Sequence, residues 1–283
     1  MSKKERSHDT LGTRIKECYE LPECSRRLIP LCPGIVRLDG RAFHSFTRGL
    51  ARPFDERFQK VMLETTRVLV GEAGARVGYT QSDEISLLLY NPDLESELLF
   101  GGKFAKLNSI LAGIAANTFV HFGRIHLPEK FPPGQRPAKL PVFDCRTFSV
   151  PILHEAANVF VWRQADCTRN AISMAAQSVY SHRELLEKNS KEQQEMLFQK
   201  GINFNDYPWQ FKRGVFVQHR KVKRKFSIDE IEKLPPKHAA CTNPDLEVTR
   251  SEFVDVDYDL RRIANRVAVL FDGIEPQYGS EVA

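Results

Sequence analysis

The order of apolar runs along the chain predicts a sheet built from alternating strands and helices. The run that ends at Leu38 reads as a strand, residues 55–71 as a helix, residues 75–79 and 85–90 as a hairpin, and residues 103–122 as a second helix, after which Val142 opens another strand. This order is β-α-β-β-α-β, as in ferredoxin-like folds. We therefore expect an α+β fold, with an antiparallel sheet and helices on one face. The end of the first strand and the tip of the hairpin would then share one edge of the sheet.

Carboxylates stand at both of those positions. Asp39 ends the first strand, and Asp83-Glu84 lies in the hairpin turn. Two adjacent strands that each deliver a carboxylate can hold divalent cations, as two-metal phosphoryl transfer requires. Simpler interpretations exist for each alone, since Asp-Gly is a common turn dipeptide and the hairpin tip could be merely solvated. The nearby Arg41 and His44 suit phosphate, and so favour a binding site over a bare turn.

Composition narrows the class of protein. The chain has 283 residues, 42% hydrophobic and 27% charged, which is ordinary for a soluble globular protein. No apolar run approaches the roughly 18 residues that a membrane span needs, and residues 1–10 lack the apolar stretch of a secretory signal. We therefore expect a cytoplasmic protein with no membrane partner. The net charge of +5 permits weak affinity for nucleic acid without demonstrating it.

Three segments resemble the signature segments of the tRNA-histidine guanylyltransferases and their tRNA-guanylyltransferase-like relatives. They are RLDGRAFH at 37–44, QSDE at 81–84 and WRQADC at 162–167, in the family's order. The resemblance implies a polymerase palm-like catalytic domain over residues 1–222 and leaves residues 223–283 as a C-terminal extension of unknown role. It also implies two Mg²⁺ ions and the addition of nucleotides in the 3′-to-5′ direction to the 5′ end of RNA. The substrates would be ATP and GTP or other nucleoside triphosphates.

The resemblance also assigns roles to single residues. Asp39 and Asp83 would bridge the metals, with Gly40 lending a carbonyl oxygen and Glu84 close by as a third catalytic residue. The positions expected to bind nucleotide and triphosphate, with Asp55 orienting the loop that holds Arg52, are Arg41, Ala42, Phe43, His44, Arg52, Asp55, Ser82, Lys103, Lys106 and Arg146. The two lysines would stand at a helix start, where the helix dipole also favours an anion.

One segment departs from the guanylyltransferases proper. After Asp166-Cys167 those enzymes have a histidine, a hydrophobic residue and two asparagines, whereas this chain has Thr168-Arg169-Asn170-Ala171. That motif is tied to adding an extra guanylate opposite an untemplated position of histidine tRNA. We therefore favour template-dependent repair of the 5′ end of tRNA. The alternatives are the guanylyltransferase reaction itself, another palm-type nucleotide phosphotransferase, and a non-catalytic RNA-binding relative.

The expected partners follow from the same resemblance. They are tRNA, nucleoside triphosphates and further copies of the chain in a homo-oligomer, a tetramer by family habit. We interpret Trp162 and Trp209 as packing residues. The basic residues at 220–225 are interpreted as solvated surface, with contact to an RNA backbone as the alternative.

Overall fold

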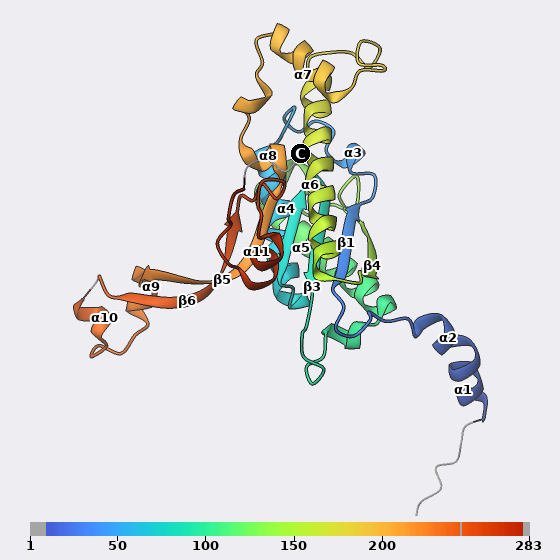
Figure 1. Ribbon diagram of the computed structural model, residues 1–283, viewed down its shortest axis with the longest axis vertical. Helices are drawn as coiled ribbons and strands as arrows, with labels where there is room; N and C mark the ends of the chain where they lie inside the picture. Colours follow the sequence, from blue (N-terminus) through green and yellow to red (C-terminus); the bar gives the residue numbers. More distant parts are fainter. Residues whose placement is uncertain (1–9, 244, 280–283) are drawn as a thin grey trace, which may run out of the picture.

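The computed structural model describes residues 10–243 and 245–279 and builds them around one six-stranded sheet (Figure 1). The strands are β1 (Gly34–Gly40), β2 (Val77–Gln81), β3 (Glu84–Leu89), β4 (Phe143–Ser149), β5 (Val215–Lys225) and β6 (Glu247–Val256). Their order is β4-β1-β3-β2-β5-β6, and every neighbouring pair is antiparallel. The first four strands, with the helices between them, form the predicted β-α-β-β-α-β unit, and the α+β class is confirmed.

The helical elements connect and cover these strands. They are α1 (Thr10–Ile15), the π-helical turn Lys16–Glu20, α2 (Leu21–Cys24), α3 (Phe43–Phe46), α4 (Glu56–Ala73), α5 (Phe104–His126), α6 (Leu153–Gln177), α7 (Ser190–Gln199), α8 (Trp209–Arg213), α9 (Ile228–Glu232), α10 (Ala239–Thr242) and α11 (Arg266–Asp272), with 3₁₀ turns at Leu99–Gly102, Pro128–Lys130 and Phe204–Asp206. None of the helices in the described part of the chain is both long and apolar enough to cross a bilayer.

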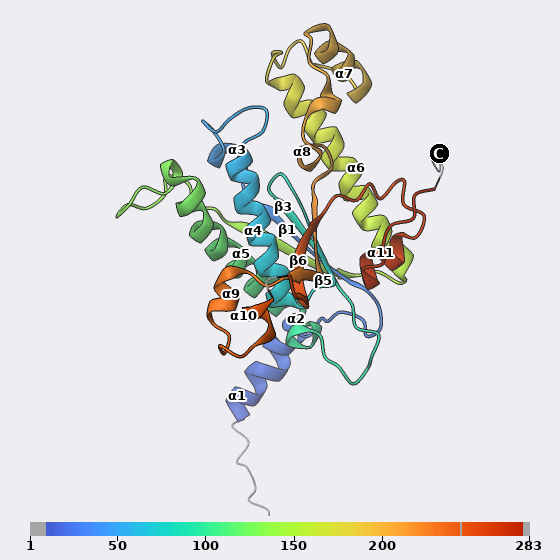
Figure 2. The same ribbon diagram turned by 90° about the vertical axis from the view of Figure 1, so that its left-hand side faces the viewer.

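The two helices of the predicted unit lie on one face of the sheet, and helices from outside that unit cover the other face. Figure 2 shows α4 and α5 on one side, and α6 and α11 on the other. Successive side chains on a strand point to opposite faces. In β1, Val36 and Leu38 join the cluster under α4 and α5, and Ile35 joins the cluster under α6. Since Leu87 and Leu88 on β3 are both fully buried, the central strands require cover on each face.

The C-terminal segment belongs to the same body. The predicted boundary after residue 222 falls inside β5, and Tyr258, Leu260 and Phe271 share a buried cluster with Phe160 of α6. The family motifs mark catalytic positions, so a segment that packs against the back of the sheet gave no signal there. The outer parts of β5 and β6, with α9 and α10, do project from the body (Figure 1).

Asp55 begins α4 and fixes the loop that precedes it. Its carboxylate accepts the backbone N–H of Arg57 at 2.9 Å and of Phe58 at 3.2 Å, and also that of Ala51 at 3.0 Å. Burial alone would raise the pKa of Asp55, but hydrogen bonds from the Arg57 side chain and these N–H groups outweigh it and lower the pKa to about 2. The loop-orienting role expected of Asp55 fits these contacts.

We expect Asp55→Ala to lower the free energy of unfolding by about 1–2 kcal/mol at pH 7, as other N-cap removals do. An unfolded aspartate has a pKa of about 3.9, above the folded value of about 2. The contribution of the charge is therefore complete above roughly pH 5 and fades as the pH falls toward 2. Urea unfolding of both proteins at pH 7 and pH 3 should show a smaller difference at pH 3. A difference independent of pH would mean that the carboxylate charge is not involved.

Candidate active site

The end of β1 and the β2–β3 turn meet at one edge of the sheet. Asp39 lies opposite Glu84 in the register of β1 and β3. The backbone N–H of Gly40 donates to the carbonyl oxygen of Asp83 at 3.0 Å. The structure thus brings the two aspartates together, as the strand order predicted.

These two carboxylates carry more negative charge than their surroundings offset. Burial, together with the charge of Asp39, raises the pKa of Asp83 to about 6. Burial also raises the pKa of Asp39, and the nearby Asp144 adds to this. Within the described residues, Ser82 is the one side chain that donates a hydrogen bond to Asp83, at 3.2 Å, and no group donates one to the Asp39 carboxylate. A cation at this edge would relieve the repulsion.

The donor set fits a hard divalent cation. Carboxylate oxygens are the ligands that such cations prefer, and Mg²⁺ in particular is often held by one or two carboxylates plus substrate phosphates. Across the part of the chain that the structure describes, there is no group of three or more His, Cys, Asp and Glu side chains that could hold a metal on its own. Two aspartates would leave most of the coordination positions of such a metal to triphosphate oxygens and water. They therefore suit a metal that binds together with triphosphate.

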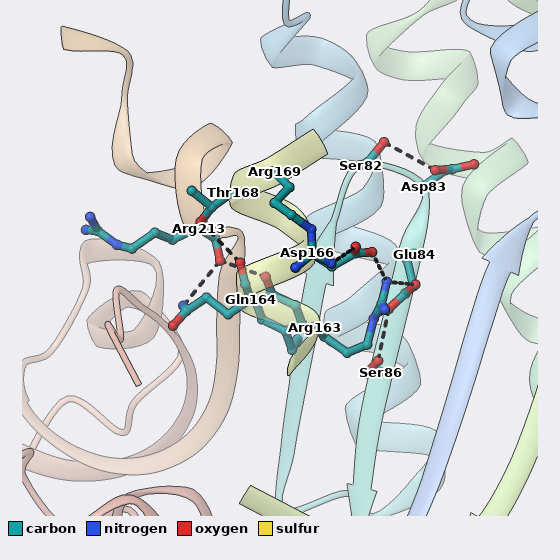
Figure 3. A network of polar contacts seen from close by, with 11 residues as sticks. Ser82, Asp83, Glu84, Ser86, Arg163, Gln164, Asp166, Thr168, Arg169 and Arg213 are labelled. Atoms are coloured by element: carbon teal, nitrogen blue, oxygen red, sulfur yellow. Dashed lines mark hydrogen bonds and ion pairs between the residues drawn. The ribbon is translucent and has the colours of Figure 1, made fainter. Parts of the chain in front are cut away.

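Glu84 stands beside the aspartates but is held by an arginine. Nε and Nη2 of Arg163 donate to its two carboxylate oxygens at 2.6 and 2.7 Å, and the same Nη2 reaches Asp166 at 2.7 Å (Figure 3). The Glu84 and Arg163 residues are each 6% exposed. Glu84, predicted as a catalytic residue, is thus not a free metal ligand here. Its position suits anchoring the turn that carries Asp83.

Arg163 is a site residue that sequence reasoning missed, although its segment was singled out. It lies on the same face of α6 as Phe160 and Cys167, which are both buried. A charged residue at that spacing on an apolar helix face requires a buried partner. The spacing of Phe160, Arg163 and Cys167 could therefore have indicated a buried ion pair. Its guanidinium also lies 4.4 Å from the ring centre of Trp162, which is 49% exposed and so packs at the surface rather than in the core.

A cavity of about 490 Å³ opens at this edge of the sheet, between the β1–α4 loop, the hairpin tip, α6 and α8. The predicted residues that line it are Gly40, Ala42, Phe43, His44, Arg52, Asp55, Ser82 and Asp83. The Phe43 side chain belongs to the core beneath the cavity, where it packs on Phe119 and Phe143. Among the lining residues that were not predicted are Phe54 and Phe211, whose rings stack with centroids 4.7 Å apart.

Arg41 and Arg146 lie near this edge without lining the cavity. Arg41 follows β1 directly, and its backbone N–H donates to the backbone carbonyl oxygen of Val142 at 2.8 Å. Arg146 on β4 pairs with Asp144 at 3.2 Å, and its charge opposes the rise in the pKa of Asp39. Arg146 therefore lies where an anion bound beside Asp39 would feel its charge.

Lys103 and Lys106 lie at the opposite end of the sheet. The backbone N–H of Phe104, next to Lys103, donates to the backbone carbonyl oxygen of Arg26 at 3.0 Å. Two residues after Arg26, Leu28 packs against Gly34, where β1 begins. Because β1 has 7 residues, Asp39 is roughly 16 Å farther along the strand. Within one chain these lysines therefore lie away from the aspartates, and their role in binding triphosphate stays a prediction. The helix after β3 must start where β3 ends, away from Asp83, and that reasoning was open to the sequence.

Comparisons with known proteins agree on one family. A family model described as tRNAHis guanylyltransferase matches residues 13–151. The tRNA(His) guanylyltransferase of Debaryomyces hansenii is 31% identical over 204 residues, which covers 67% of this chain and 74% of that protein. A bacterial tRNA(His) guanylyltransferase (Thg1)-like protein in complex with ATP is 37% identical, with a TM-score of 0.67 over 74% of this chain and 87% of that one. A complex with GTP of a bacterial protein described in the same words has 30% identity and a TM-score of 0.64, over 87% and 91%.

The buried pair of Glu84 and Arg163 leads to a stability prediction. Arg163→Met should lower the free energy of unfolding by about 3–5 kcal/mol, because it leaves a buried carboxylate without a partner. Arg169→Met is the control, since it removes only the exposed partner of Asp166 and should cost less than about 1 kcal/mol. Urea denaturation followed by circular dichroism measures both. Equal losses in the two variants would contradict the anchoring role, whereas adding Glu84→Met to Arg163→Met should restore most of the stability.

Proposed function

The chain belongs to the tRNA(His) guanylyltransferase family, and on that premise we propose that it is a template-dependent nucleotidyltransferase that repairs the 5′ end of tRNA. It would add nucleotides in the 3′-to-5′ direction. The 5′-monophosphate of the tRNA would attack the α-phosphorus of ATP or GTP and release pyrophosphate, unless the end is already a triphosphate. The 3′-hydroxyl of the incoming nucleotide would then lose its proton and attack the 5′ phosphorus of the tRNA, which releases the activating nucleoside monophosphate, or pyrophosphate from a 5′-triphosphate.

The observation that carries this proposal is the pair of under-neutralised aspartates at the edge of the cavity. Asp39 and Asp83, with the Gly40 carbonyl, would hold two Mg²⁺ ions, which when bound offset phosphate charge and polarise the reacting phosphoryl group. The cavity volume of about 490 Å³ is in the range of small-molecule and cofactor sites.

The chain's own side chains would bind and orient the substrate in that cavity. His44 and Arg52 line it and offer donors to phosphate, and the stacked rings of Phe54 and Phe211 offer an aromatic surface for a base. The ion pair from Arg163 to Glu84 keeps the turn beside Asp83 in place. Positioning and electrostatic stabilisation are the main contributions that a protein makes to phosphoryl transfer.

The α6 wall supports dependence on a template. Thr168 donates its hydroxyl to the backbone carbonyls of Gln164 and Lys212 at 3.2 and 3.0 Å, and Arg169 pairs with Asp166 at 2.6 Å. Of the four residues 168–171, only Asn170 and Ala171 line the cavity, and only the first carries a polar side chain. With so few protein contacts available from this segment, pairing with an opposing base would have to choose the nucleotide.

Guanylate addition to histidine tRNA is the alternative that the family itself favours, because relatives are named for it. A palm-type phosphotransferase that uses nucleotides alone would share the carboxylates but not the need for RNA. The homo-oligomer, a tetramer by family habit, stays a prediction.

The first test concerns the aspartates. Asp39→Asn and Asp83→Asn should each reduce nucleotide addition at least about a hundred-fold, because each removes an anionic ligand from a site that must neutralise triphosphate. Neither should destabilise the fold, since each also removes a half-buried charge that repels its neighbour. Glu95→Gln, on the exposed loop after β3, is the control and should keep full activity. Addition to a 5′-truncated tRNA with Mg²⁺ and labelled triphosphates, alongside urea unfolding, measures both effects. Near-normal addition by either asparagine variant would contradict the metal assignment.

The second test separates the two family reactions. A tRNA that lacks its first 5′ nucleotide should be extended by whichever nucleotide pairs with the opposing base. An intact histidine tRNA, with adenine or no residue at the opposing position, should be the poorer substrate. The two are compared under saturating triphosphates, with the opposing base varied. Efficient guanylate addition to the intact tRNA regardless of template would overturn repair and favour the guanylyltransferase reaction.

A further inference from the structure

β5 and β6 continue past the body of the protein as a two-stranded ribbon (Figure 1). We define the ribbon as residues 219–225 of β5 and 247–253 of β6, paired from His219↔Phe253 to Lys225↔Glu247. The first residues of β5, up to Gln218, are buried, and from His219 outward exposed and half-buried residues alternate. The two faces of the ribbon therefore meet different surroundings.

On one face of the ribbon, the arginines form ion pairs with carboxylates of the same chain. Arg220 pairs with Glu275 at 2.9 Å. Arg224 pairs with Glu230 of α9 at 2.6 Å and with Glu252 across the ribbon at 2.5 Å. The positive charge on this face is neutralised by neighbouring carboxylates and contributes to packing of α9 on the ribbon.

On the other face of the ribbon, two lysines have no carboxylate partner among the described residues. Lys221 and Lys223 are exposed, and no carboxylate within the described residues pairs with either one. Opposite them on β6 stand Ser251 and Thr249, which are neutral and exposed. Among the residues that the structure describes, the one ion pair of this face lies at its outer end, where Lys225 pairs with Asp245 at 2.6 Å. Alternate strand residues repeat about every 6.6 Å, so the face presents evenly spaced ammonium groups beside hydroxyls.

We propose that this lysine face, formed by Lys221, Lys223, Thr249 and Ser251, binds the sugar–phosphate backbone of the tRNA substrate. Lysines and hydroxyl side chains are the groups that contact phosphates without reading sequence, and unpaired cations release counterions when they bind a polyanion. The proposal rests on the proposed function, since it identifies where the same tRNA docks.

The position of the ribbon gives it a role in affinity rather than chemistry. Val215, where β5 begins, pairs with Thr80 close to the hairpin tip. Lys221 is then roughly 20 Å down the strand from that level. The lysine face would therefore hold a part of the tRNA remote from the reacting 5′ end, while the triphosphate site is untouched.

The experiment compares charge removal at two places on the same projecting arm. The test variant is Lys221→Gln with Lys223→Gln, and the matched control is Lys233→Gln with Lys237→Gln, which removes the same charge from exposed lysines beside α9. Filter binding of tRNA over a range of salt concentrations gives affinity and its salt dependence. We expect the test variant to bind roughly ten-fold more weakly, with a slope of log K against log salt lower by about 2, and the control to match the wild type.

Kinetics and a conservative variant complete the design. In nucleotide addition, the test variant should raise KM for tRNA and leave kcat and the KM for nucleoside triphosphate unchanged. Lys221→Arg with Lys223→Arg should restore binding. If the wild type extends tRNA while the test variant and control bind it equally, the lysine face is wrong and the proposed function stands. If the wild type neither binds nor extends tRNA, the proposed function is wrong and this proposal falls with it.

Discussion

The buried ion pair between Glu84 and Arg163 joins the parts on which the candidate site depends. Glu84 is the first residue of β3, next to the turn that presents Asp83, and Arg163 lies midway along α6. A charged pair in this position has a high desolvation cost, and its geometry has to be good to offset that cost. The bidentate contact fixes the spacing of sheet and helix. The cavity between them, and the direction in which the hairpin tip points, follow from that spacing.

The structure also shows which parts of the molecule could be read from sequence. The β-α-β-β-α-β unit was predictable because its strands and helices have distinct apolar periods, and the meeting of Asp39 with Asp83 follows from strand order alone. The second face of the sheet was not predicted, because covering it involves Tyr258, Leu260 and Phe271, which lie far along the chain from β1 and carry no motif. Pairings at that separation leave no local pattern.

What the sequence left open at the site has a similar origin. Lys103 and Lys106 were expected to bind triphosphate because they match basic family positions at a helix start, an argument that does not say at which end of the sheet the helix begins. Arg163 was overlooked because α5 and β4 separate it in sequence from its partner Glu84, although its place on an apolar helix face marked it. In both cases the residue type was visible in the sequence, and its position in three dimensions was not.

The closure of the α6 face by the C-terminal segment has a consequence for how the protein forms. Gln164, next to Arg163, donates to the Tyr258 carbonyl at 2.6 Å and accepts the Leu260 N–H at 2.9 Å, and α11 packs near by in the same cluster. The three family motifs, at 37–44, 81–84 and 162–167, are synthesised before Tyr258 and Leu260. The nascent chain therefore has an uncovered apolar surface on Phe160 and Tyr79 until residues 258–271 have been synthesised. Contacts of such long sequence separation slow folding and prolong exposure to aggregation, so residues 258–271 govern when the site between the sheet and α6 is complete.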